Sequence, residues 1–137
     1  MALDYYAHFL LEANRLKEAY HCLDKAYKTC IQVNGKEHEQ TVVLLNDLGT
    51  ISNLMGNADR AVSLIEEAVE IGSQLPEMKD LGSIYVNLGH VYFLKKMLDE
   101  CEKACMDGKK LATKYGDKET QEEAKVCLKE VRQAMKG

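Results

Sequence analysis

The chain has 137 residues with one proline and no tryptophan, and 46% of its residues are hydrophobic. This length suits one domain, and plentiful Ala, Leu, Glu and Lys favour helices over strands. The formal net charge is only −4 and no Lys/Arg cluster follows one face, which argues against nucleic-acid binding, and no stretch approaches the roughly 20 apolar residues of a membrane span.

Turn-forming residues divide the chain into seven expected helices. Asn34-Gly35 is a pair suited to a left-handed helix end, and Gly56-Asn57 and Gly116-Asp117 mark later breaks. Pro76 cannot continue a helix and is expected to open the next one. The expected helices cover about residues 2–13, 16–33, 39–55, 58–74, 77–94, 97–115 and 117–135.

The last of these helices has the pattern of a cap. Its apolar residues recur at intervals of three and four, which predicts one buried stripe. The stripe consists of Ala124, Cys127, Leu128, Val131 and Met135. The charged residues between them would form a polar outer face, as the terminal helix of a repeat stack requires.

One spacing occurs three times along the chain. A large residue and a small one are followed twelve residues later by a second small residue, with an apolar residue four positions further on. The three sets are Tyr6-Ala7 with Ala19 and Leu23, Leu48-Gly49 with Ala61 and Ile65, and Leu88-Gly89 with Cys101 and Cys105. Such a pattern is typical of two antiparallel helices whose backbones approach at the small residues.

These residues resemble the tetratricopeptide repeat family. Tyr85-x2-Leu88-Gly89-x2-Tyr92 matches the first half of its motif, and the three sets share one register over residues 3–113. In the third set Gly108 replaces the alanine of the others, which predicts a looser second helix. The resemblance implies an all-α, right-handed superhelix of three helical hairpins with a capping helix. The expected repeats span about 2–34, 38–75 and 77–115, and the cap spans about 117–135.

The family resemblance implies a protein-binding scaffold with no enzymatic activity and no cofactor. The Asn34–His38 turn and the unit lengths resemble a mitochondrial member of the family. That resemblance implies a factor of the mitochondrial inner membrane for assembly or maintenance of respiratory complex III, acting at its Rieske iron–sulfur subunit. The alternative is a peptide-binding adaptor similar to kinesin light chains, although Glu39 stands where that group usually has proline.

The first helix of each pair is expected to line a concave groove. Counting from the Leu-Gly anchors predicts eight exposed partner-binding positions: Tyr5, His8, Glu12, Asn46, Thr50, Asn53, Asn87 and His90. Asparagine offers both a donor and an acceptor, so Asn46 and Asn87 are candidates for binding a partner's backbone. Asparagine on a helix surface is otherwise simply hydrated.

The cysteines and histidines offer an enzymatic or metal-binding alternative. Five cysteines fit neither a disulfide framework nor a zinc site, and Cys101 and Cys105 occupy core positions of their repeat. Cys101-x3-Cys105 would need two further ligands to hold a metal, so no metal site is expected. No nucleophile is predicted beside His8 or His90, and His38 is placed at a helix start.

A third hypothesis is self-association. Residues 1–10 already form an amphipathic pattern, so we expect a fragment of a longer protein whose repeat end exposes Met1, Leu3 and Leu10 to a second copy. From Lys36 to Asp80, nine acidic residues oppose three basic ones. This excess permits a basic partner surface, but an ordinary solvated face explains it better.

Overall fold

The computed structural model describes the backbone of residues 2–137 and the side chains of residue 12 and residues 14–137. Over this range it contains helices and no strand, which confirms the all-α class. The helices are α1 (Ala2–Asn34), α2 (Glu39–Leu54), α3 (Ala58–Ser73), α4 (Leu81–Leu94), α5 (Leu98–Tyr115) and α6 (Lys118–Lys136). None of these helices has an apolar stretch that could cross a bilayer.

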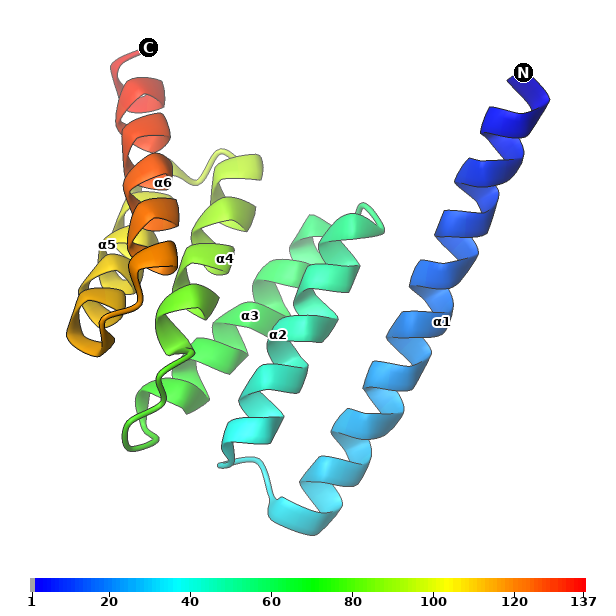
Figure 1. Ribbon diagram of the computed structural model, residues 1–137, viewed down its shortest axis with the longest axis horizontal. Coiled ribbons are helices and arrows are strands. Elements are labelled where there is room, and N and C mark those ends of the chain that lie inside the picture. Colours follow the sequence, from blue (N-terminus) through cyan, green and yellow to red (C-terminus); the bar gives the residue numbers. More distant parts are fainter. Residues whose placement is uncertain (1) are drawn as a thin grey trace.

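The helices form a stack that begins with α1 and ends with α5 and α6 (Figure 1). The pairs α2–α3 and α4–α5 are the hairpins of the stack, and α3 also packs against α4. At the far end α6 packs against both α5 and α4, as expected of a capping helix. Among the described helices, the backbone of α1 packs against α2, and α1 contacts α3 only through side chains, with Arg60 of α3 donating a hydrogen bond to the hydroxyl of Tyr20.

The first segment differs from the prediction, because α1 is one continuous helix where two had been expected. The prediction of separate helices over 2–13 and 16–33 is therefore wrong. Its physical reason is local: Asn14 and Arg15 were read as a break, but the span from Ala2 to Asn34 holds neither Gly nor Pro. Asparagine alone costs a helix well under about 1 kcal/mol, which is too little to end it.

The small residues of the repeated spacing lie where helices meet. Leu48, Ala61 and Ile65 are buried, and a Cβ added to Gly49 would lie 2.4 Å from Cγ1 of Ile65. A Cβ on Gly89 would lie 2.5 Å from Sγ of Cys105. Both glycines therefore set a close helix approach, and the predicted register of the second and third units is confirmed.

Gly108 has the opposite effect to the one expected. A Cβ on Gly108 would lie 2.8 Å from the backbone oxygen of Gly82, and a Cβ on Gly82 would lie 3.1 Å from the oxygen of Gly108. The two glycines thus face each other across α4 and α5. The prediction of a looser helix is wrong, because this pair brings the two backbones into direct contact.

The turns follow the sequence signals with one exception. Gly35, Gly56 and Gly116 all have positive φ, at 82°, 87° and 70°, as their places after helix ends require. Pro76 does not open a helix, because α4 begins only at Leu81. The segment between α3 and α4 is instead a turn in which Glu77 has a φ of 54°.

The cysteines of the third unit lie in the core together with one from the cap. Cys101, Cys105 and Cys127 are all buried, as the core prediction required for the first two. Cys105 and Cys127 form a disulfide that joins α5 to α6. The expectation of no disulfide framework is therefore wrong for this pair, whereas Cys22, Cys30 and Cys101 are free.

Candidate partner-binding face

Asn46 and Asn87 come together where α2 and α4 lie side by side. Nδ2 of Asn87 donates a hydrogen bond of 3.2 Å to Oδ1 of Asn46, although 41 residues separate them in the chain. Both side chains are half-buried. Among the residues whose side chains the structure describes, Nδ2 of Asn46 and Oδ1 of Asn87 have no further hydrogen-bond partner, so one donor and one acceptor remain available to a bound molecule.

The other predicted positions of α2 and α4 surround this pair. Thr50 is exposed, and its hydroxyl donates to the backbone oxygen of Asn46 at 3.0 Å. Asn53 is half-buried one turn further along α2, and His90 is exposed on α4. We call Asn46, Thr50, Asn53, Asn87 and His90 the amide face.

The predicted positions of the first unit cannot be placed in the same way. Tyr5 and His8 lie outside the residues whose side chains the structure describes. Glu12 is exposed on α1, the helix that packs against α2. Their part in partner binding therefore stays a prediction.

Asp47 on α2 and Tyr85 on α4 are two half-buried titratable groups to which the sequence analysis gave no functional role. Burial raises the pKa of the Asp47 carboxyl above its ordinary value. Burial also raises the pKa of Tyr85, with the charge of Asp107 adding to the effect. The motif match had placed Tyr85 at a packing position, and Asp47 stands at an unmarked position of the motif, so no sequence signal singled them out.

A cleft of about 310 Å³ opens between α4 and α5. It is lined by Tyr85, Leu88, Tyr92, Glu100, Lys103, Ala104 and Asp107. Tyr92 is buried, as its core position predicted, and its hydroxyl donates a 2.5 Å hydrogen bond to Glu66 of α3. Burial raises the pKa of Tyr92, and the bond to Glu66 raises it further, so the phenol is neutral and acts as a donor.

His21 and His38 lie outside the amide face and outside the α4–α5 cleft. His38 begins α2, as predicted, and its Nδ1 accepts a 3.1 Å hydrogen bond from the backbone of Gln40. His21 is exposed on α1. His38 is thus explained by helix capping, which satisfies a backbone donor at the helix start.

Three sulfur atoms form the one group of metal-ligating type found among the described residues. Those of Cys101, Cys105 and Cys127 all lie within 4.8 Å of one another. The sequence analysis found only two of them, because Cys127 comes from the capping helix. The disulfide uses two of the sulfurs, and burial raises the pKa of Cys101 to about 11, so its thiol stays protonated at neutral pH. Cys101, Cys105 and Cys127 therefore have the properties of packed core residues.

A basic cluster is present where the sequence analysis expected none. Side chains from α5 and α6 converge on one groove, and six of the eighteen basic residues line it. The part on α6 was readable, because Lys125, Lys129, Arg132 and Lys136 recur at helical intervals of four, three and four. The part on α5 depends on how the two helices pack, which the sequence did not reveal.

Comparison with known proteins gives two matches to family models. Both models are described as tetratricopeptide repeat, and they match residues 1–74 and 82–115. Among solved structures, the crystal structure of BtubC (BKLC) from P. vanneervenii aligns with a TM-score of 0.66 at 19% identity, covering 90% of this chain and 59% of that one. The likeness to BtubC concerns the fold, and the superhelix of helical repeats is confirmed.

Curated relatives carry one recurring name. The chain is 27% identical over 135 residues to Tetratricopeptide repeat protein 19 homolog, mitochondrial, of Drosophila melanogaster, covering 98% of this chain and 36% of the relative. It is 32% identical over 80 residues to Tetratricopeptide repeat protein 19, mitochondrial, of Rattus norvegicus, covering 57% of this chain and 22% of the relative. The Danio rerio protein of that name is 35% identical over 72 residues, covering 53% of this chain and 18% of the relative. The chain thus spans about a third or less of the length of these relatives.

Proposed function

The chain belongs to the tetratricopeptide repeat family, and from this premise we propose that it holds a protein partner against the amide face of α2 and α4. The family and the names of the relatives point to a non-catalytic interaction scaffold. The observation that carries the proposal is the hydrogen bond between Asn87 and Asn46. It leaves one amide donor and one amide acceptor side by side on neighbouring repeats.

An amide pair of this kind suits recognition of a peptide backbone. A peptide group presents one N–H and one C=O, and the free Asn46 donor and Asn87 acceptor match that pair. Because the side chains are half-buried and already bonded to each other, little conformational freedom is lost when a partner binds. Thr50 and His90, both exposed, would contact the partner's own side chains.

We further propose a place for this scaffold in the cell. The relatives are named mitochondrial proteins, which supports a mitochondrial location for this chain. The resemblance to Tetratricopeptide repeat protein 19 supports a finer proposal: a factor at the inner membrane that assists assembly or maintenance of complex III at its Rieske subunit. The alternative is a general peptide-binding adaptor of the kinesin-light-chain type, with the same face and a different partner.

The test is a pull-down from detergent-solubilised mitochondria with mass spectrometry as the readout. The baits are the parent chain and the Asn46→Ala/Asn87→Ala variant. Loss of both amides should weaken binding by roughly 1–3 kcal/mol, which is a drop of about five-fold to more than a hundred-fold in affinity. We expect complex III subunits to be enriched by the parent and not by this variant.

Gln32→Ala/Gln74→Ala is the matched control. It also removes two amides, both exposed and both outside the amide face, so it should recover the same subunits as the parent. Equal recovery by all three baits would move the binding site off the amide face. A parent bait that enriches other proteins and no complex III subunit would favour the general adaptor.

Self-association was predicted from Met1, Leu3 and Leu10, whose side chains lie outside the described set. It therefore stays a prediction, tested by whether the sedimentation coefficient rises with protein concentration. A rise that the amide variant does not change would separate self-association from partner binding.

A further inference from the structure

A groove runs between α5 and α6 on a part of the molecule separate from the amide face. It consists of two adjoining clefts of about 390 Å³ each, which share Lys109, Leu128 and Arg132. The remaining residues of the lining are Met106, Lys110, Thr113, Lys125, Lys129, Gln133 and Lys136. We call this surface the α5–α6 groove.

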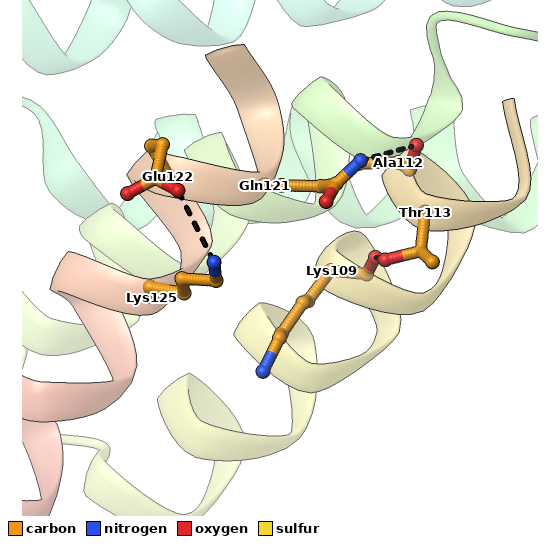
Figure 2. Close-up of polar contacts among 6 residues, drawn as sticks. All are labelled: Lys109, Ala112, Thr113, Gln121, Glu122 and Lys125. Atoms are coloured by element: carbon orange, nitrogen blue, oxygen red, sulfur yellow. Dashed lines mark hydrogen bonds and ion pairs between the residues drawn. The ribbon is translucent and has the colours of Figure 1, made fainter. Parts of the chain in front are cut away.

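The rim of the groove is basic. Six of its lining residues are Lys or Arg, and none is Asp or Glu. Arg132 pairs with Glu102 and Lys125 with Glu122, each at 3.1 Å. Within the described part of the chain, Lys109, Lys110, Lys129 and Lys136 form no ion pair. Figure 2 shows the two helices side by side, with Lys109 projecting from α5 and Lys125 from α6.

This concentration of positive charge contrasts with the rest of the molecule. The chain carries 18 basic and 22 acidic residues, so only twelve basic residues lie outside the groove to balance all 22 acidic ones. The net charge of −4 therefore conceals a local positive surface on an acidic protein. A basic surface on an otherwise acidic protein directs acidic partners to that surface, because the rest of the protein repels them.

The floor of the groove is apolar. Leu128 is buried at its base, and Met106 is half-exposed with 50% of its surface open to solvent. Lys125 and Lys136, the first and last cations on α6, are eleven positions apart, a length of about 16 Å or three helical turns. A groove with cations along three turns of one helix and Leu128 and Met106 between them has the charge and apolar contact to receive one helix.

We propose that the α5–α6 groove docks an acidic amphipathic helix from a protein partner. The apolar side of that helix packs on Met106 and Leu128, and its carboxylates pair with Lys109, Lys129 and the cations beside them. The four lysines without an ion pair supply this attraction at no loss of an existing contact. Met106 supports the fit, because methionine adapts its shape to different apolar partners.

A protein helix fits this groove better than a nucleic acid does. Among its lining residues there is no aromatic side chain on which a base could stack. The apolar floor would gain little from a phosphate backbone. In addition, the acidic remainder of the chain would repel a long polyanion that extends beyond the groove.

The experiment uses the full chain and a synthetic probe. The probe is a fluorescent peptide with Leu at positions of one helical face and Glu at the others, and binding is measured by fluorescence anisotropy. Lys109→Glu/Lys129→Glu reverses two groove charges that form no ion pair, so it should lower affinity at least roughly ten-fold. Added salt should weaken binding to the parent.

Two controls separate the groove from general electrostatics. Lys25→Glu/Lys79→Glu makes the same change of net charge at exposed residues outside the groove and should bind the probe like the parent. A peptide of the same composition with its Leu residues spread around the helix should bind at least several-fold more weakly. Thermal melting of each variant checks that it is folded.

The opposite results would overturn the proposal. These are equal binding by both charge variants, equal binding of the two peptides, or tighter binding of single-stranded nucleic acid than of the acidic helix. Amide NMR shifts caused by the probe should cluster on α5 and α6. Shifts clustered on α2 and α4 would place this ligand on the amide face instead. Loss of self-association in the groove variant, without peptide binding by the parent, would replace the partner with a second copy of the chain.

Discussion

Gly89, whose side chain is a single hydrogen atom, sets the distance between α4 and α5. Its missing side chain leaves room for Sγ of Cys105, which would lie 2.5 Å from an added Cβ. Sγ of Cys105 cannot rotate away, because it is bonded to Cys127. At the equivalent Gly49 the neighbour is the side chain of Ile65, which has other rotamers to adopt.

Gly89→Ala should therefore destabilise the fold by about 1–3 kcal/mol, the usual cost of overpacking a core. Urea denaturation followed by circular dichroism measures the change in the free energy of unfolding. Ser63→Ala, at an exposed position of α3, is the control and should stay within about 0.5 kcal/mol of the parent. A Gly89→Ala protein as stable as the parent would show that α4 and α5 are not in contact there.

The residue scale also shows where the sequence was informative. The Leu-Gly anchors predicted Gly49 and Gly89 as contact points, because a small residue at that place in the motif has only one steric purpose. The Cys105–Cys127 bond could not be predicted, since a separation of 22 residues says nothing of which thiols meet. Asn46 and Asn87 were predicted as exposed amides, but their mutual hydrogen bond depends on the packing of α2 against α4.

At the scale of single helices, α6 and α3 begin with N-cap side chains of different charge, Asp117 and Asn57. Asp117 begins α6, and its Oδ1 accepts a 3.1 Å hydrogen bond from the backbone of Thr120. The hydroxyl of Thr120 donates a second bond to Asp117, and these contacts hold the pKa of the Asp117 carboxyl below its ordinary 3.8. Asn57 begins α3 with a similar bond of 3.1 Å to the backbone of Arg60, but it carries no charge.

The two caps should respond differently to pH. A carboxyl with a lowered pKa in the folded state stabilises the protein above its ordinary pKa and loses that effect as pH falls through the lowered value. Asp117→Ala should therefore reduce the melting temperature at neutral pH, and the reduction should shrink below pH 3.8. Thermal unfolding at both pH values measures it.

Asn57→Ala is the matched control for that experiment. It should cost about 1 kcal/mol at either pH, because an amide cap does not titrate in this range. If the deficit of Asp117→Ala were as large in acid as at neutral pH, the charged hydrogen bonds of Asp117 would not be the source of its stabilising effect.

The helix ends that glycine marks were predicted, whereas the false break near Asn14 and the false start at Pro76 rested on a single residue each. Gly35 and Gly116 end helices at the expected positions with positive φ. The supposed break near Asn14 had only a weak local preference behind it, and α1 continued through it. Pro76 was predicted correctly as a helix breaker but wrongly as a helix start, because a turn follows it as far as Asp80 and α4 begins only at Leu81.

At the scale of the whole molecule, the described helices differ in how many other helices they pack against. The central α4 packs against α2, α3, α5 and α6, whereas among the described helices the backbone of α1 packs only against α2 and reaches α3 through the Tyr20–Arg60 contact. Local opening costs less free energy where fewer contacts must break. Amides in residues 14–34 of α1 should therefore exchange with solvent deuterium faster than those of α4.

The helix α6 is the control for this exchange experiment, because it also lies at one end of the stack. It packs against α5 and α4 and is bonded to α5 by the disulfide, so its amides should exchange more slowly than those of α1. Hydrogen exchange with mass spectrometry resolves the three helices. Equal protection of α1 and α6 would contradict this account of the stack.

Whole-molecule features were the hardest to predict. The fold followed from three repeats of one spacing, since each repeat is a local unit. The α5–α6 groove is shared between two helices, and only the α6 half of its charge was visible as a helical stripe. The composition suggested no basic surface, because the net charge of −4 adds the basic groove to the acidic surfaces elsewhere on the molecule.

The bond between Cys105 and Cys127 has a mechanical consequence. A load applied at the end of α6 passes directly from Cys127 into α5 and from there into the centre of the stack. The segment 106–126 lies between the two bonded cysteines. Fully extended it would span roughly 70 Å, but the disulfide bypasses it, so pulling on α6 does not stretch it. A partner held on the α5–α6 groove would thus pull on an end of the molecule that the disulfide keeps from unravelling.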